Sequence, residues 1–195
     1  MSPEVIIKKA FRRILKIVFG FDHWHTSVLE ERPYALDIVK YCDARGTRGS
    51  ILEIGCGLAD ILRKVDYKQK MGFDIDTKVL NGARFISFFD GGPKITFAQF
   101  HFPDTELREI VDVLIMVNWI FFFDEDTLRR YIEKYFRQNV NEGGAIIVDT
   151  LRDPHYPNHH NVKTLTANLP CNIVKLGNYL RQREVWAIEK KSLAG

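Results

Sequence analysis

The sequence contains few cysteines, little net charge and no long apolar run. Its three cysteines, Cys42, Cys56 and Cys171, are an odd number without the spacing of metal ligands, which argues against a disulfide framework and favours reduced thiols in a cytosolic protein. No apolar run reaches the roughly 18 residues that a transmembrane helix needs, and no targeting signal is visible. The net charge of +3 is too small to indicate nucleic-acid binding.

What is present is the composition of one globular domain. The chain has 195 residues, of which 46% are hydrophobic and 27% charged, and it shows no internal repeat, low-complexity tract or linker. The small positive charge is unevenly placed, because residues 1–20 carry five Lys and Arg against one Glu. The rest of the chain is close to neutral, so the basic character is confined to the N-terminus.

Residues 5–19 predict a basic amphipathic helix. The apolar residues that recur at helical spacing are Ile7, Phe11, Ile14, Leu15 and Val18. Three roles for this helix remain open: packing on its own domain, contact with a membrane surface, or an oligomer contact. An aromatic, histidine-bearing loop follows, and a second helix is predicted over 30–42. We interpret residues 1–49 as a helical cap or lid on a main domain formed by residues 50–195.

Beyond residue 50, short apolar runs alternate with helical stretches, a pattern typical of a parallel sheet covered by helices on both faces. The predicted strands are 50–54, 70–75, 94–99, 111–117, 144–150, 171–180 and 183–191. The predicted helices are 58–65, 77–88, 125–138 and a short one near 161–167, with at most one or two turns at 103–109. The last two strands are almost contiguous, which predicts an antiparallel hairpin at the sheet edge. The fold class is therefore α/β and doubly wound.

The first predicted strand ends in Glu53 and runs directly into Gly-Cys-Gly. Gly55 and Gly57 tolerate positive φ and carry no Cβ, so a ligand can lie against the backbone at this turn, which belongs to the ligand-binding edge of such a sheet. A dinucleotide fingerprint would need Gly or Ala where the sequence has Asp60. Two carboxylates beside the turn would also repel a pyrophosphate. A cofactor with a cationic end and no phosphate is compatible with them.

The segment ILEIGCGLAD resembles the first motif of the class I S-adenosylmethionine-dependent methyltransferases, and KMGFDID is similar to their second motif. VDVLIMVNWI and VNEGGAIIVDT match the fourth and fifth strands of the family less specifically. The resemblance covers about residues 50–190. It implies a Rossmann-like sheet of strand order 3-2-1-4-5-7-6 with an antiparallel strand 7, S-adenosylmethionine as cofactor, and methyl transfer as the activity.

The same resemblance implies the residues that would bind the cofactor. Asp74 would take both ribose hydroxyls, since one carboxylate offers two acceptor oxygens. The family usually has an acid after the third strand for the adenine amino group, but this sequence has His101 there, so backbone groups would hold the adenine. The implied cofactor-binding set is Glu53, Gly55, Cys56, Gly57, Asp74, Ile75, Phe100, His101 and Asn118. Asp60, three residues after Gly57, is interpreted as a first-turn acid that complements a helix dipole.

All six histidines fall in predicted loops. His25 and His155 are the candidates for a general base that takes a proton from an acceptor hydroxyl. The candidate contacts with the acceptor are Trp24, Trp119 and His159. The histidines after the fifth strand match no standard metal-ligand spacing, so no metal is predicted.

The expected reaction is O-methylation of a small molecule, or of an acceptor linked to a glycan or lipid. A nucleic-acid substrate is not expected, because NWIF lacks the prolines of the Asn/Asp-Pro-Pro-aromatic element. Two alternatives remain: a non-catalytic S-adenosylmethionine-binding or assembly subunit, and an aminopropyltransferase, which the same scaffold supports. The expected location is the cytoplasm, with residues 5–19 as a candidate contact with the inner membrane surface; the oligomeric state is not predicted.

Overall fold

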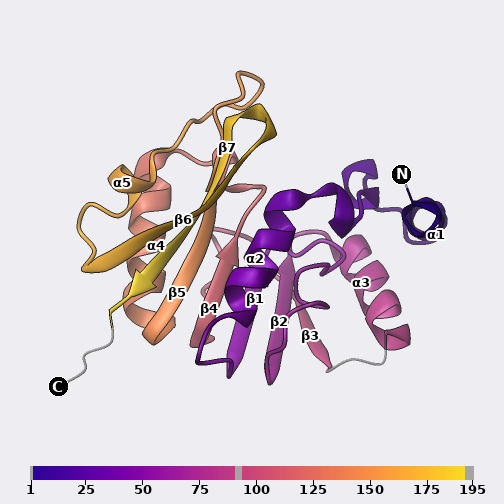
Figure 1. Cartoon of the computed structure of the whole chain (residues 1–195), viewed down its shortest axis with the longest axis horizontal. Helices are drawn as coiled ribbons and strands as arrows, with labels where there is room; N and C mark the ends of the chain where they lie inside the picture. Colours follow the sequence, from indigo (N-terminus) through magenta and orange to yellow (C-terminus); the bar gives the residue numbers. More distant parts are fainter. Residues whose placement is uncertain (1, 91–93, 192–195) are drawn as a thin grey trace.

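The computed structural model describes residues 2–90 and 94–191 and contains one seven-stranded sheet. The strands are β1 Ser50–Ile54, β2 Gln69–Asp74, β3 Ile95–Gln99, β4 Val111–Met116, β5 Val140–Thr150, β6 Cys171–Tyr179 and β7 Arg183–Lys190. Their order is β3-β2-β1-β4-β5-β7-β6, and only β7 runs antiparallel, to both β5 and β6. The predicted order and the antiparallel seventh strand are confirmed (Figure 1).

Most of the α-helices begin after a residue whose side chain caps the first turn. The α-helices are α1 Pro3–Phe19, α2 Pro33–Asp43, α3 Thr77–Phe89, α4 Glu125–Gln138 and α5 Val162–Leu165, with 3₁₀ turns η1 His23–Thr26, η2 Leu29–Glu31, η3 Ile120–Phe122 and η4 Leu180–Gln182. Asp76 and Asp124 accept backbone N–H groups in the first turns of α3 and α4, which satisfies donors that a helix start leaves unpaired.

Helices cover both faces of the sheet, as predicted. Successive strand residues point to opposite faces, so Ile51 packs with α2 and α3 in one core, while Leu52 packs with α4 and α5 in the other. All five residues of β1 and all six of β4 are buried. Burial on both faces explains why most residues of these two central strands are apolar.

The predicted helix over 58–65 is wrong, because this segment forms consecutive turns. Ala59 has a φ of 58°, a left-handed conformation that interrupts a helical path. The backbone hydrogen bonds then mix two spacings. The Ala59 amide donates to the carbonyl of Cys56, three residues before it, whereas the Arg63 amide donates to the carbonyl of Ala59, four residues before it. The irregular path turns Asp60 into the protein, where its side chain is buried.

Helix α1 packs on the domain mainly through its charged side. The ion pairs are Lys8 with Glu30, Lys9 with Glu31, and Arg12 with Asp60. Leu15 is the one apolar residue of α1 that is fully buried. Of the three roles open to this helix, packing on its own domain is confirmed for the basic side.

Within residues 2–90 and 94–191, no helix combines the length and apolar character that crossing a bilayer demands.

Candidate active site at the glycine turn

Hydrogen bonds from its backbone amides connect the turn after β1 to the neighbouring strand β2. Gly55 and Gly57 have φ of 76° and 52°, values open to glycine at little cost. The amides of Gly55 and Cys56 both donate to the carbonyl of Phe73, at 2.7 and 3.0 Å. The Gly57 amide donates to Oδ2 of Asp74 at 2.8 Å. The glycine turn and the end of β2 therefore form one unit.

Asp74 is buried at this junction and keeps acceptor capacity. Its Oδ1 accepts the amide of Asp76 at 3.0 Å, and its Oδ2 accepts that of Gly57. Burial raises the pKa of Asp74, while these two amide hydrogen bonds oppose the rise. Each carboxylate oxygen can accept more than one hydrogen bond, so both remain able to accept from a ligand.

Glu53 is a buried acid with an unsatisfied oxygen. Its residue is 4% exposed, and its Oε2 has no hydrogen-bond partner within the described part of the chain. Burial raises the pKa of Glu53 well above its ordinary value, against the attraction of the Arg32 guanidinium. A buried polar atom without a partner costs free energy, and a cationic ligand group would satisfy it.

Glu53→Gln should therefore stabilise the ligand-free protein. A carboxyl whose pKa is raised by folding contributes stability below its unfolded pKa of about 4.3 and loses it as the pH rises through the folded value. At pH 8 the variant should gain about 1 kcal/mol in free energy of unfolding, measured by urea titration. The gain should vanish near pH 4. Glu106→Gln, at a solvent-exposed carboxylate, is the control, and an equal gain in both variants would contradict this reading of Glu53.

Two side chains occupy the space in front of the glycines. A Cβ on Gly55 would overlap the indole of Trp119, and one on Gly57 would lie 3.0 Å from Nδ1 of His25. Trp119 is held there because its Nε1 donates to the Ile54 carbonyl at 2.7 Å. Neither glycine could carry a side chain without displacing these groups.

His25 is half-buried, and its pKa is lowered by that burial. The negative charges of Asp74, Asp76 and Asp22 oppose the shift. The imidazole is therefore neutral near pH 7 and able to accept a proton. Trp24 beside it is 61% exposed, with its ring centroid 5.8 Å from that of His25.

The remaining implied cofactor contacts differ in exposure. Ile75 follows β2 and is 60% exposed, whereas Phe100 is buried, stacks on Phe73 and donates its amide to the Asp74 carbonyl. The His101 side chain is exposed, and its amide donates to Thr105 Oγ1. Burial raises the pKa of the Cys56 thiol well above its ordinary value, so this thiol is not an activated nucleophile.

A second set of hydrogen-bonded polar residues lies where β4 and β5 end. Asn118 has a φ of 73°, and its amide donates to Oδ1 of Asp149 at 3.0 Å. Arg183 donates to Oδ2 of Asp149 at 2.7 Å and also to Oδ1 of Asn118, and its guanidinium lies over the ring of Tyr34. Asp149 and Arg183 were missed by sequence reasoning; an acid closing the apolar fifth strand was the available signal.

The loop after β5 holds a histidine–aspartate pair. Nδ1 of His155 lies 2.6 Å from Oδ1 of Asp153, and the imidazole is largely exposed to solvent. Nε2 of His159 lies 3.0 Å from the Asp153 carbonyl. No cluster of three metal-ligating side chains was found among residues 2–90 and 94–191.

Sequence reasoning also misread Asp60. It is not a first-turn acid of a helix but the centre of a buried ion cluster, in which it accepts from Arg12, Arg32 and Arg63. Burial raises its pKa, but the three guanidinium groups outweigh that effect and leave the pKa lowered. The positive charge of Arg32 also acts to lower the pKa of Glu53. The cluster thus joins the N-terminal segment to the glycine turn.

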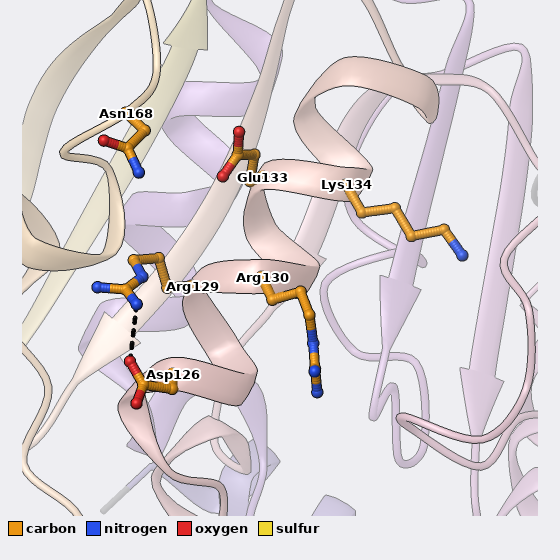
Figure 2. A pocket seen from close by; sticks show the side chains of 6 residues that line it. All are labelled: Asp126, Arg129, Arg130, Glu133, Lys134 and Asn168. Atoms are coloured by element: carbon orange, nitrogen blue, oxygen red, sulfur yellow. Dashed lines mark hydrogen bonds and ion pairs between the residues drawn. The ribbon is translucent and has the colours of Figure 1, made fainter.

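A surface hollow seen in Figure 2 lies along α4. It is lined by Asp126, Arg129, Arg130, Glu133, Lys134 and Asn168. These side chains carry both signs of charge, and Arg129 pairs with Asp126 at 2.8 Å. Such a mixed, solvated helix face is ordinary for a soluble domain, and none of its residues belongs to the glycine turn. It is not assigned as the active site.

No protein-family model matches the chain, and no curated protein matches it either. Solved structures do. The N-methyltransferase NodS from Bradyrhizobium japonicum, in complex with S-adenosyl-L-homocysteine, is 15% identical, with a TM-score of 0.71 over 92% of this chain and 97% of that one.

Magnesium protoporphyrin IX methyltransferase from Synechocystis with bound S-adenosylmethionine is 11% identical, with a TM-score of 0.68 over 98% of both chains. The amino pentose methyltransferase CalS10 from Micromonospora echinaspora is 11% identical, with a TM-score of 0.64 over 95% of this chain and 97% of that one. At these identities the similarity concerns the fold. The chain has the Rossmann-like fold of the class I S-adenosylmethionine-dependent methyltransferases.

Proposed function

We propose that this chain is an S-adenosylmethionine-dependent methyltransferase. The observation that carries the proposal is a turn without Cβ atoms between two buried carboxylates, Glu53 and Asp74. Structural neighbours with bound S-adenosylmethionine or its demethylated product support the choice of cofactor. The acceptor is a small molecule or a group linked to a glycan or lipid, and O-methylation is the favoured reaction.

The residues around the turn suit the parts of this cofactor. Asp74 would accept from the two ribose hydroxyls, and the unpaired oxygen of Glu53 would accept from the ammonium group of the methionine end. The exposed side chain of Ile75 offers an apolar surface for the adenine, with backbone groups of Phe100 and His101 at its edge. Asn118 completes the proposed contacts at the end of β4.

S-adenosylmethionine supplies an activated methyl group on a sulfonium, so the protein need contribute little covalent chemistry. The main task of this chain is to align the acceptor and exclude water, since positioning alone lowers the barrier substantially. Trp24, Trp119 and His159 are the proposed acceptor contacts. Residues 1–49 would act as a lid, which is supported by His25 against Gly57 and by the arginines that bind Asp60.

A base must receive the proton of an acceptor hydroxyl. His155 suits this role because Asp153 contacts its Nδ1 and leaves Nε2 directed elsewhere, the arrangement that orients a catalytic imidazole. His25 is the second candidate, since its lowered pKa keeps it neutral near pH 7.

The proposal is tested by incubating the chain with methyl-labelled S-adenosylmethionine and a panel of hydroxyl and amine acceptors. Label in a small-molecule product is expected. Cofactor binding without product from any acceptor would favour a non-catalytic subunit, and an aminopropyl product from decarboxylated S-adenosylmethionine would favour the alternative transferase. Failure to bind the cofactor at millimolar concentration would overturn the proposal.

The two base candidates are separated by single substitutions. Glutamine in place of the catalytic base should lower kcat by about 100-fold, with KM for the cofactor almost unchanged. We expect this for His155→Gln. His25→Gln should mainly raise the KM for the cofactor, because His25 lies against Gly57. His23→Gln, in the same 3₁₀ turn but exposed, should match the parent; the reverse pattern would assign the base to His25.

An acceptor carried on a lipid would require the domain to work at the cytoplasmic surface of a membrane. We propose this location for the protein if its acceptor is lipid-linked. A soluble acceptor makes no such demand. The two are distinguished by comparing methyl transfer to an acceptor in detergent-free solution with transfer to the same head group in vesicles.

A further inference from the structure

The outward side of α1 is apolar, although its inward side is charged. Six apolar side chains on this helix are 43 to 82% exposed: Ile6, Ile7, Phe11, Ile14, Ile17 and Val18. A surface helix normally turns its apolar stripe to the core and its charges to water. Here the arrangement is reversed, because ion pairs with Glu30, Glu31 and Asp60 draw the basic side chains inward.

The apolar surface continues onto α3, which lies beside α1 (Figure 1). The ring of Phe19 at the end of α1 lies 5.8 Å from that of Phe85, and Phe85 lies 5.0 Å from Phe89. Phe85, Phe88 and Phe89 are each 40 to 80% exposed. We call these nine exposed side chains of the two helices the α1–α3 apolar surface. A contiguous patch of this kind marks an interaction site more often than chance exposure does.

Cations border this surface. Arg13 on α1 and Lys78 on α3 are exposed, and neither belongs to the inward ion pairs described above. The only acid in α1 is Glu4, which pairs with Lys8. At the far end of α3, Asp90 pairs with Arg63. An apolar face with basic flanks is the arrangement that binds in the interface of a bilayer, where long basic side chains reach the head groups.

We propose that the α1–α3 apolar surface docks on an anionic lipid bilayer. The alternative occupant is a second copy of this chain. A twofold contact places the same surface of both copies face to face, so it would bring two sets of the flanking basic residues into one interface, where like charges oppose association. Anionic head groups complement these cations instead. The inference does not depend on methyl transfer, since it concerns a surface outside the glycine turn.

The test is flotation of the full chain with vesicles of phosphatidylcholine alone or mixed with phosphatidylglycerol. Binding is expected to the mixed vesicles and to weaken in high salt. Ile17→Glu and Phe88→Glu should each reduce binding by about tenfold or more, as losing one buried apolar side chain predicts. Both sites are about 80% exposed, so folding should survive, which circular dichroism checks. Ile110→Glu, at an exposed apolar residue before β4, is the matched control.

If the chain floats with neither kind of vesicle, the proposal is overturned. A concentration-dependent dimer in light scattering, abolished by the same two variants, would assign the surface to a second copy. Equal loss in the Ile110 control would show that any added charge weakens adsorption, and would also count against a specific surface. Methyl transfer to a soluble acceptor should be unchanged in Phe88→Glu, because Phe88 lies in α3, outside the proposed lid, so failure here is distinguishable from failure of the proposed activity.

Discussion

Asp60→Asn should lower the free energy of unfolding by about 3–5 kcal/mol, the range expected when one partner of a buried ion cluster is removed. Arg12 is 5% exposed and depends on Asp60 for its charge balance. The substitution leaves the guanidinium groups of Arg12, Arg32 and Arg63 facing one another without the carboxylate between them. Urea titration at pH 7 measures the loss.

Asp66→Asn provides the comparison. Asp66 pairs with Arg48 across an exposed surface, and such pairs contribute at most about 1 kcal/mol. A loss in Asp60→Asn no larger than that in Asp66→Asn would show that the cluster is solvated and carries little energy.

The effect of Asp60 should also depend on pH. Its pKa is lowered by folding because three arginines outweigh burial. An acid of this kind contributes stability above its unfolded pKa of about 3.9 and loses that contribution as the pH falls through the folded value. The difference between the parent and Asp60→Asn should therefore be full at pH 7 and shrink as the pH falls below about 4. A difference that is constant with pH would indicate a packing defect instead of a lost charge.

Asp74→Ala should weaken S-adenosylmethionine binding by an order of magnitude or more, measured by calorimetry. Two hydrogen bonds from ribose hydroxyls to one carboxylate are charge-assisted, and losing them costs more than losing neutral ones. The variant also removes the acceptor of the Gly57 amide, so the glycine turn itself would loosen.

Asp74→Asn separates these two effects. It keeps the size and one acceptor oxygen for the Gly57 amide but removes the negative charge. Asp76→Ala is a further control, because Asp76 caps α3 and should cost stability without a comparable loss of affinity. Normal binding by Asp74→Asn and Asp74→Ala, both shown to be folded, would mean that the ribose is not held at the end of β2.

The sheet could be predicted from sequence because its central strands β1 and β4 are buried on both faces, and all its strands read as extended, mainly apolar segments between helical ones. The failure at 58–65 has a local cause. Apolar periodicity does not encode the left-handed φ of Ala59, and the segment buries Leu58, Ile61 and Leu62 in turns as a helix would.

The amphipathic pattern of α1 was also visible in the sequence, but periodicity shows only that two faces exist. It cannot tell which face is inside, because that depends on acids far along the chain. Asp60 is 48 residues from Arg12, and no local rule links them.

The glycine turn, Glu53 and Asp74 were found because their chemistry lies in short, ordered motifs. The side chains that lie over the turn were proposed for other reasons: Trp119 and His25 were candidates for the acceptor and the base, and the structure places both against the glycines. Contacts of this kind depend on the three-dimensional path of the N-terminal segment and of the chain after β4, which no motif specifies.

The shared carboxylate of Asp60 has a thermodynamic consequence. Arg12 belongs to α1 and Arg63 to the segment after the glycine turn, so any event that shifts one of them alters the energy of the other. By thermodynamic linkage, if a ligand bound at the glycine turn changes the affinity of α1 for the bilayer by some factor, the bilayer changes the affinity of the turn for that ligand by the same factor. Titrating the cofactor with and without vesicles, or vesicles with and without the cofactor, would give the same coupling free energy.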